Sequence, residues 1–481
     1  MVAVIVKIWY KLCKIFIHQE GVFMRSLYVS IIILLSSVVV VARDIPEQDP
    51  FSEANKRYDE SDWSGANAQY KRVHEELRKK NNNDECDKLA SVRGHVNYAD
   101  VLYSRAVGKL AKQQYEKAGR LMLLACDHWA HRLEGGQFGR KPLNNEWDGT
   151  DLTGKRILVY SERDGGAFGD TFYMTPMLRF LKEKGAHVIL VPQKPLQKFY
   201  QMKNTEHALY VDEVALRGDT LPQHDAAIYL WSILKYYLKD VPAKDLFPMA
   251  PWMSGDGDQK FTGQLEQRFQ ELKKDNGGKD VAVVGMWWRS SGSASLAADW
   301  RSLSRDPGAN RMTSIVQGMP VLVVNLEGLG RRPLTESEYN TLKEENKLGN
   351  SDPIDITSHD TSNVFNFTPD FDKEVPFGDT VTVMEWIKNK GGILMGCDTG
   401  LANMAAGVKK NDAQKGHKSV YVILNKKADH RWGDDATSPR DWHHSEDVQV
   451  FQAQEQDKWE QPINQAREAF MDYIDHVLNK K

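Results

Sequence analysis

Hydrophobic positions in the first part of the chain recur at three- and four-residue steps, which predicts amphipathic helices between about residues 50 and 131. One helical stretch carries these positions at Ala54, Trp63, Ala66, Tyr70 and Val73. A second stretch repeats the offsets at Ala106, Tyr115, Ala118, Met122 and Ala125. The alternation of small and large residues would let two antiparallel helices approach closely.

This alternation resembles the tetratricopeptide repeat, whose helix pairs carry small residues with aromatics between them. The period differs, because Ala66 and Ala118 are 52 residues apart and the repeat has about 34. The excess lies in a polar loop that begins at Lys79. Two interpretations remain: a divergent repeat pair that binds a protein partner or the acceptor, or a generic helical hairpin pair that packs on the next domain.

Beyond the helical part the pattern changes to short apolar runs that alternate with helices, such as Thr171–Lys184. Continuous apolar strands separated by helices are typical of parallel sheets buried on both faces. The fold class predicted is therefore α/β, with two Rossmann-like, doubly wound lobes after an all-α helical-repeat region. The expected strands are Arg156–Tyr160, His187–Pro192, Ala226–Leu230, Val281–Trp288, Val321–Leu326, Gly392–Gly396 and Ser419–Leu424.

Turn-rich and polar segments set the expected boundaries. A glycine-rich linker precedes the first strand, and the polar stretch Gly255–Gly278 divides the α/β part into two similar halves. A periodic stretch, Gln461–Leu478, closes the chain as a helix. We expect a signal or anchor at 1–43, a tetratricopeptide-like region at 44–134, a linker at 135–153, lobes at 154–260 and 279–460, and the closing helix at 461–481.

The N-terminal segment predicts passage across a membrane. The apolar run Leu27–Ala42 follows Arg25 and precedes acidic sequence. It is short for a hydrocarbon core of about 30 Å, and its small residues suit a signal peptidase. We expect a mature protein that begins near Arg43 and is secreted, lumenal or periplasmic. The alternative is an uncleaved single-pass anchor, which is the only membrane contact expected.

Composition narrows the function classes. The formal net charge of −3 gives no basic footprint for nucleic acid. Four cysteines show no metal-ligand spacing, although a Cys86–Cys126 disulfide remains an alternative in an oxidising compartment. The Asp-x-Asp triplets at Asp256 and Asp370, and the histidines His430, His443 and His444, are interpreted as loop or cleft-lining residues. No metal or cofactor is expected.

The first candidate motif runs from Ser161 to Pro176, between an expected strand and an expected helix. Its glycines, including Gly166 and Gly169, permit positive φ and close backbone approach, and free amides at a helix start suit an anion. Asp170 would oppose a phosphate there but can act as a general base aimed into a cleft. The alternative is that Asp170 only caps the helix.

The second motif, Gly392–Gly407, is a buried strand that leads through Asp398 and Thr399 into a helix of small residues. Helix-start amides and the Thr399 hydroxyl can hold a diphosphate without a metal. The alternative is a capping residue followed by a glycine needed for tight packing.

The two motifs together resemble the heptosyltransferase-like glycosyltransferases, especially the branch in which that domain follows tetratricopeptide repeats. The family's Gly-Asp-x-x-x-x-x-Pro run is matched by Gly169, Asp170 and Pro176. Its Asp-Thr-Gly-x-x-His run is matched from Asp398, with Asn403 in the histidine's place. Weaker echoes are Gly154–Val159, the run Val284–Trp288 with Asp299–Ser302 after it, and Phe377–Thr380.

The resemblance covers roughly 300 residues and implies two Rossmann-like lobes of the GT-B type. It implies that Asp170 is the catalytic base and that Arg289 or Arg301 stabilises the leaving nucleotide. The donor, a nucleotide-diphosphate sugar, would be held by Gly166, Gly169, Glu327, Asp398, Thr399, Gly400 and Asn403. Heptose itself does not follow, because Asn403 departs from the family's pattern.

Two functions from different classes compete. The first is an inverting, metal-independent glycosyltransferase that moves a sugar to a hydroxyl acceptor. The second is a non-catalytic binding or scaffold protein that joins helical repeats to a transferase-like lobe pair. Other two-lobed enzymes, such as a sugar-nucleotide epimerase, form a third class. The environment of Asp170 and Asn403 discriminates between the first two.

Overall fold

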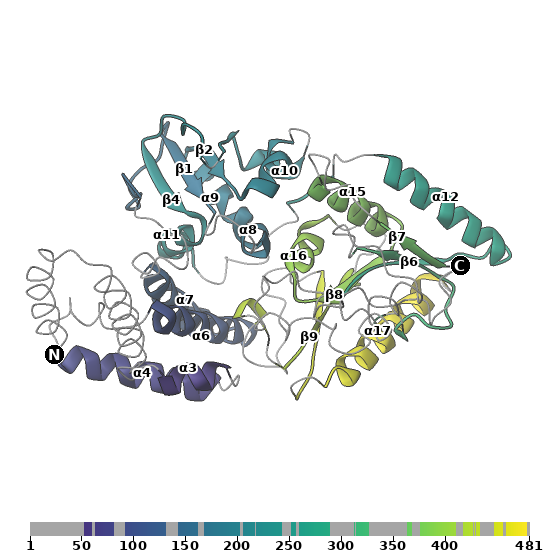
Figure 1. The fold of residues 1–481 in the computed structure, drawn as a ribbon, viewed down its shortest axis with the longest axis horizontal. Coiled ribbons are helices and arrows are strands. Elements are labelled where there is room, and N and C mark those ends of the chain that lie inside the picture. Colours follow the sequence, from purple (N-terminus) through teal and green to yellow (C-terminus); the bar gives the residue numbers. More distant parts are fainter. Residues whose placement is uncertain are drawn as a thin grey trace, which may run out of the picture. The chain divides into compact units, whose positions relative to one another are not determined.

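Two parallel β-sheets form the α/β part of the protein in this computed structural model (Figure 1). Within the residues described, Glu53–Lys481 form one unit. The description covers residues 52–59, 63–80, 92–130, 143–161, 168–202, 205–216, 218–242, 252–255, 259–288, 312, 314–326, 363–367, 376–409, 417–426, 428, 430–432, 447–455 and 458–478.

The first sheet has the order β3-β2-β1-β4, with all neighbours parallel. Its interior strands are almost wholly apolar and buried, which explains their continuous hydrophobic runs. The helices that follow are short. The strands are β1 (Arg156–Tyr160), β2 (His187–Val191), β3 (Glu213–Val214) and β4 (Ala226–Tyr229), and the helices are α8 (Phe168–Met174), α9 (Leu178–Glu183), α10 (Gln197–Gln201) and α11 (Ile233–Asp240).

The second sheet has the order β10-β9-β8-β5-β6-β7, again all parallel. The helix α17 contacts β9 and β10, and α15 contacts β5 and β8. The strands are β5 (Ala282–Trp287), β6 (Val321–Asn325), β7 (Val364–Asn366), β8 (Ile393–Cys397), β9 (Val420–Leu424) and β10 (Val448–Gln452). The helices are α12 (Gln259–Asp275), α15 (Pro376–Asn389), α16 (Gly400–Gly407) and α17 (Glu460–Leu478).

The predicted α/β class with two parallel sheets is confirmed, and every strand expected from the sequence is present. Three edge strands, β3, β7 and β10, were not expected, because two are very short and β10 is only partly buried at three of its five positions. The expected helix Thr171–Lys184 is interrupted. Pro176 lies in a 3-10 turn, Thr175–Met177, between α8 and α9, which accords with proline's poor fit in a helix interior.

Among the described residues, four helices precede the first sheet: α3 (Ser52–Asp59), α4 (Trp63–Lys80), α6 (Val92–Ala111) and α7 (Tyr115–Ala130). α6 and α7 lie side by side (Figure 1). The predicted small positions of this segment are buried, but Tyr115, the first residue of α7, is exposed. Cys126 is a buried thiol outside any disulfide among the described residues, and Cys86 lies outside them.

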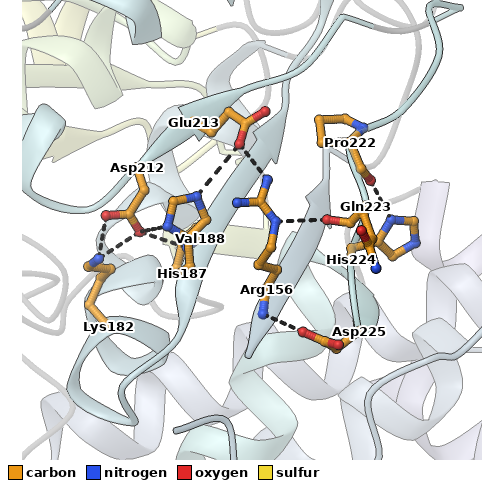
Figure 2. Close-up of polar contacts among 10 residues, drawn as sticks. All are labelled: Arg156, Lys182, His187, Val188, Asp212, Glu213, Pro222, Gln223, His224 and Asp225. Carbon is orange, nitrogen blue, oxygen red and sulfur yellow. Dashed lines mark hydrogen bonds and ion pairs between the residues drawn. The ribbon is translucent and has the colours of Figure 1, made fainter. Parts of the chain in front are cut away.

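The amino-terminal edge of the first sheet carries a network of charged side chains (Figure 2). Arg156 at the start of β1 pairs with Glu213 at 2.6 Å, and its backbone amide donates to Asp225. Asp212 accepts from Lys182 and from the Val188 amide. These contacts provide hydrogen-bond partners at the starts of β1 and β2, at the edge of the sheet opposite to the start of α8.

None of the described helices combines the length and apolar character needed to cross a bilayer. The apolar run Leu27–Ala42 lies outside the described residues, so the expected signal or anchor stays a prediction.

Candidate functional site

Asp170 lies inside α8, which follows the carboxyl end of β1. It is the third residue of the helix as described, so it is not the residue that precedes the helix. The alternative in which Asp170 serves only as the N-cap is therefore wrong. Gly166 lies outside the described residues.

Buried hydroxyl groups and aromatic rings hold α8 in place. The Thr171 hydroxyl donates to Gln193 Oε1 at 2.8 Å, and Thr175 and Tyr200 share a hydrogen bond of 2.6 Å. The Phe172 ring packs edge-on against Phe377 at the start of α15. A helix anchored in this way presents the Asp170 carboxylate in a defined direction.

The second motif also follows the carboxyl end of a strand. The fully buried Trp287 side chain lies where a Cβ on Gly396 would stand, and its Nε1 donates to the Cys397 carbonyl at 2.8 Å. β8 therefore needs glycine at 396 and ends beside a fixed ring. Asp398 follows β8 directly and is buried at the amino end of α16, where the helix dipole favours an anion.

Thr399 is the N-cap of α16: its Oγ1 accepts from the Leu401 amide at 3.0 Å. The capping explanation of this motif therefore holds for Thr399. A hydroxyl that accepts one hydrogen bond still carries its own proton, so Thr399 can cap the helix and also donate to a phosphate oxygen.

The two sequence motifs meet in space. A Cβ built on Gly169 would lie 3.2 Å from Asn403 Nδ2, 3.3 Å from the Gly400 Cα and 3.4 Å from Arg431 Nη1. A Cβ on Gly400 would in turn lie 3.3 Å from the Gly169 amide nitrogen. Both glycines thus stand where a Cβ would be a tight fit, and neither has a positive φ. Asn403 is buried at this junction, and its Nδ2 is 3.4 Å from the Thr399 carbonyl oxygen.

An ion pair crosses the same junction. Arg431 Nη1 donates to Asp170 Oδ1 at 2.7 Å, although the two residues are 261 positions apart in the sequence. The Arg431 side chain is 6% exposed and the Asp170 side chain 22%. Arg431 lies in the 3-10 turn His430–Trp432, which follows the carboxyl end of β9. Its guanidinium also lies 5.9 Å from the Tyr173 ring centroid, within cation–π range.

Sequence reasoning did not identify Arg431. The cations expected there were Arg289 and Arg301, which lie outside the described residues, as do Glu327, His443 and His444. The histidines of this polar stretch, including His430, were interpreted as surface or cleft-lining residues, and the neighbouring Arg431 was given no role. No repeated motif surrounds this arginine, so only the topology of β9 brings it to Asp170.

The helical segment reaches the site through Tyr103 of α6. Its hydroxyl is 2.9 Å from the Tyr173 hydroxyl, and Trp231 stacks on Tyr173 at a centroid distance of 5.6 Å. Burial raises the pKa of Tyr103 far above its ordinary value, so its hydroxyl stays protonated. α6 also contacts the turn that carries Arg431. The helices before the first sheet therefore support the surroundings of the ion pair.

The arrangement combines a partly exposed carboxylate, a guanidinium and the amino end of a helix at the carboxyl ends of two parallel sheets. Ligands bind at this edge in open α/β sheets. A carboxylate can accept a proton, and a guanidinium beside a helix start can hold an anion. Among the described residues no cluster of three or more acidic, histidine or cysteine side chains is arranged to hold a metal ion.

No protein-family model matches the sequence, and no curated protein matches it. Among solved structures, the chain is similar to the ADP-heptose LPS heptosyltransferase II of E. coli, with 11% identity and a TM-score of 0.36 over 68% of this chain and 99% of that one. A glycosyl transferase family 9 protein of Veillonella parvula gives 11% identity and a TM-score of 0.36, over 70% of this chain and all of that one.

A variant of the O-GlcNAc transferase of Thermobaculum terrenum covers more of the chain, 91% of this one and 95% of that one, with 10% identity and a TM-score of 0.26. At TM-scores this low, the similarities carry no weight for fold or function. The functional argument rests on the sheets and on the residues at their carboxyl edges.

Proposed function

We propose that this protein is a glycosyltransferase that moves a sugar from a nucleotide-diphosphate donor to a hydroxyl acceptor. The observation that carries the proposal is the 2.7 Å ion pair between Asp170 and Arg431, beside the start of α16. It combines a proton acceptor with an anion-binding cation where the two motifs of the family resemblance meet.

The proposed reaction is a single displacement with inversion. The acceptor oxygen forms a bond to the anomeric carbon while the bond from that carbon to the diphosphate oxygen breaks. The bond's electron pair leaves with the nucleoside diphosphate, and the acceptor's proton passes to the Asp170 carboxylate. Arg431, the Thr399 hydroxyl and the amino end of α16 stabilise the charge on the leaving group.

Metal independence belongs to the same proposal. The positive charge that a metal supplies in other transferases comes here from Arg431 and the helix start. We assign Gly169 and Gly400 to close backbone approach, Asn403 to the donor side of the junction and Asp398 to the support of α16. The helical segment, through α6, forms part of the surroundings of the acceptor side. We also retain the proposal that the mature protein begins near Arg43 and acts outside the cytoplasm.

The experiment is a screen of nucleotide sugars against the full chain, with release of nucleoside diphosphate as the readout. Asp170→Asn keeps the size of the side chain but removes the proton acceptor, so turnover should fall by about 10²–10⁴ while the fold is retained. Glu183→Gln is the matched control, because Glu183 is an exposed carboxylate of the same lobe paired with Arg179. It should leave turnover unchanged.

The donor side is tested with Thr399→Val and Thr399→Ser. Valine removes the hydroxyl, which should cost about 0.5–1.5 kcal/mol of nucleotide binding and about 1 kcal/mol of stability through the lost cap. Serine restores both. If Asp170→Asn retains full turnover per folded molecule, the base assignment is wrong. If no nucleotide sugar is turned over although nucleoside diphosphates bind, the non-catalytic binding protein is the better description.

A further inference from the structure

One guanidinium lies between the Asp170 carboxylate and the amino end of α16. Arg431 Nη1, Asn403 Nδ2 and the Gly400 Cα all lie within 3.4 Å of the point where a Cβ on Gly169 would stand. The same Nη1 donates to Asp170 Oδ1. The cation is thus beside the first residue of α16 while it is paired with the carboxylate on α8.

A carboxylate and a diphosphate are alternative partners for an arginine. Guanidinium groups bind both through parallel, charge-assisted hydrogen bonds, and the diphosphate carries more negative charge. Arg431 is also held from below by the Tyr173 ring and is only 6% exposed, so it has little freedom to turn toward other anions in solvent. A diphosphate at the start of α16 would therefore meet a cation whose Nη1 is already bonded to Asp170.

We propose that Arg431 is shared between Asp170 and the diphosphate, so that nucleotide binding takes the cation and releases the carboxylate. The inference rests on the proposed function and adds an order of events to it. The nucleotide sugar binds first, and only then is the Asp170 carboxylate available to the acceptor hydroxyl. Arg431 acts on the base as a positioning residue and on the donor as a binding residue.

Competition for one cation has a measurable consequence, because coupling between two partners is reciprocal. When the charge at Asp170 is removed, the charge-assisted bond from Arg431 Nη1 to the carboxylate is lost, and the diphosphate should bind more tightly. Simple repulsion between Asp170 and the diphosphate predicts the same direction. The two explanations separate when Arg431 is also changed, because repulsion does not require the arginine.

The probe is inorganic pyrophosphate, which tests the binding of a diphosphate without requiring a choice of nucleobase or sugar. Its dissociation constant is measured by calorimetry on the full chain for wild type, Asp170→Asn, Arg431→Gln and the double variant. Asp170→Asn should bind about five-fold more tightly, a factor that corresponds to the roughly 1 kcal/mol of a modest ion pair. Arg431→Gln should bind at least about ten-fold more weakly. Glu183→Gln should bind like wild type.

The decisive result is the double variant: the gain from Asp170→Asn should disappear when Arg431 is glutamine. An equal gain in both backgrounds overturns the shared cation and leaves repulsion. If Arg431→Gln does not fold, Arg431→Lys takes its place, and the gain from Asp170→Asn should shrink because an ammonium lacks the guanidinium fork.

The outcomes also separate this inference from the proposed function. If wild type transfers a sugar but Asp170→Asn does not bind pyrophosphate more tightly than wild type, the transferase stands and the sharing is overturned. Tighter binding that requires Arg431, without transfer of any nucleotide sugar, keeps the sharing and overturns the transferase. Absence of pyrophosphate binding at millimolar concentration in wild type overturns the sharing, whereas the transferase is decided separately by turnover of a nucleotide sugar.

Discussion

Two ion pairs among the described residues, Lys388–Asp447 and Arg431–Asp170, each have a buried cation but differ in almost every other respect. Lys388 in α15 donates to Asp447 at 2.6 Å and to the Val408 carbonyl, and Asp447 also accepts from the amide and hydroxyl of Ser419. Asp447 and Ser419 directly precede β10 and β9, so this pair lies at the amino ends of strands of one lobe. Its charges are fully buried or nearly so.

The Asp170–Arg431 pair lies instead at the carboxyl ends of β1 and β9 and joins segments from two different sheets. Its carboxylate is partly exposed. Burial and charge alone therefore do not identify a functional site. Partners within one lobe at the amino edge indicate a structural role, whereas a pair at the carboxyl edge, beside a helix start, indicates chemistry.

The largest effect on stability is expected at Lys388. Lys388→Met removes the cation from a buried carboxylate, which should lower the free energy of unfolding by about 3–5 kcal/mol. Turnover per folded molecule should not change. Chemical denaturation measures the first quantity and nucleoside diphosphate release the second. Lys390→Met is the matched control, because Lys390 pairs with Glu266 nearer the surface and should cost at most about 1 kcal/mol.

The next largest effect concerns His207, a buried neutral histidine. Burial lowers its pKa from 6.5 to about 4, while its Nε2 is 2.9 Å from the Phe199 carbonyl oxygen. Between these two pH values His207 is protonated in the unfolded chain but neutral in the folded chain. Stability should be full above about pH 6.5 and should fall by roughly 3 kcal/mol as the pH drops toward about 4.

Unfolding by denaturant at several pH values tests this prediction, with His207→Gln as the comparison. The variant should be less sensitive to acid across this window, because glutamine does not titrate. Parallel pH curves for the two proteins would mean that other groups dominate the acid response.

A smaller effect is expected where the helical segment supports the site. Tyr103→Phe removes the 2.9 Å hydroxyl contact with Tyr173 and should cost about 1–2 kcal/mol of stability. Tyr70→Phe is matched in kind, because the buried Tyr70 hydroxyl donates to Asn55 at 2.6 Å within the helical segment.

The two tyrosine variants should differ in the affinity for pyrophosphate. Tyr173 lies under Arg431, so only Tyr103→Phe should change the dissociation constant, by about two- to five-fold. If both variants bind pyrophosphate with the same affinity, the hydroxyl contact of Tyr103 stabilises the fold but does not influence the site.

Elements set by local sequence patterns could be predicted, whereas those that depend on contacts between distant segments could not. The core strands were predictable because both faces are buried and their apolar runs are continuous, as in β5 and β8. The edge strands β3 and β10 were not, since a short or half-exposed strand has no such run. Pro176 could have warned that the first helix is interrupted.

The site followed the same rule. Gly169 and Gly400 stood out because they occupy fixed places in the two motifs of the family resemblance, and the structure brings them close together. Arg431 did not, because an arginine in a polar turn has no local signature. Its role arises from β8 and β9 being neighbours in the sheet, a pairing that joins Leu394–Cys397 to Val420–Ile423 and that no local pattern shows. The contribution of Tyr103 is equally non-local.

The smallest effect is expected at the charged network of Figure 2. It tests whether charges at the amino edge of a sheet are structural and those at the carboxyl edge functional. Glu213 and Arg156 are each 37% exposed, so Glu213→Gln should change the free energy of unfolding by less than about 1 kcal/mol. The glutamine carbonyl can still accept from Arg156, which also keeps its bond to the Gln223 carbonyl. Because this network lies at the amino edge, turnover and pyrophosphate affinity should equal those of wild type. A ten-fold loss of either at unchanged stability would show that amino-edge charges also contribute to function, and the assignment of the site to the carboxyl edge would then be wrong.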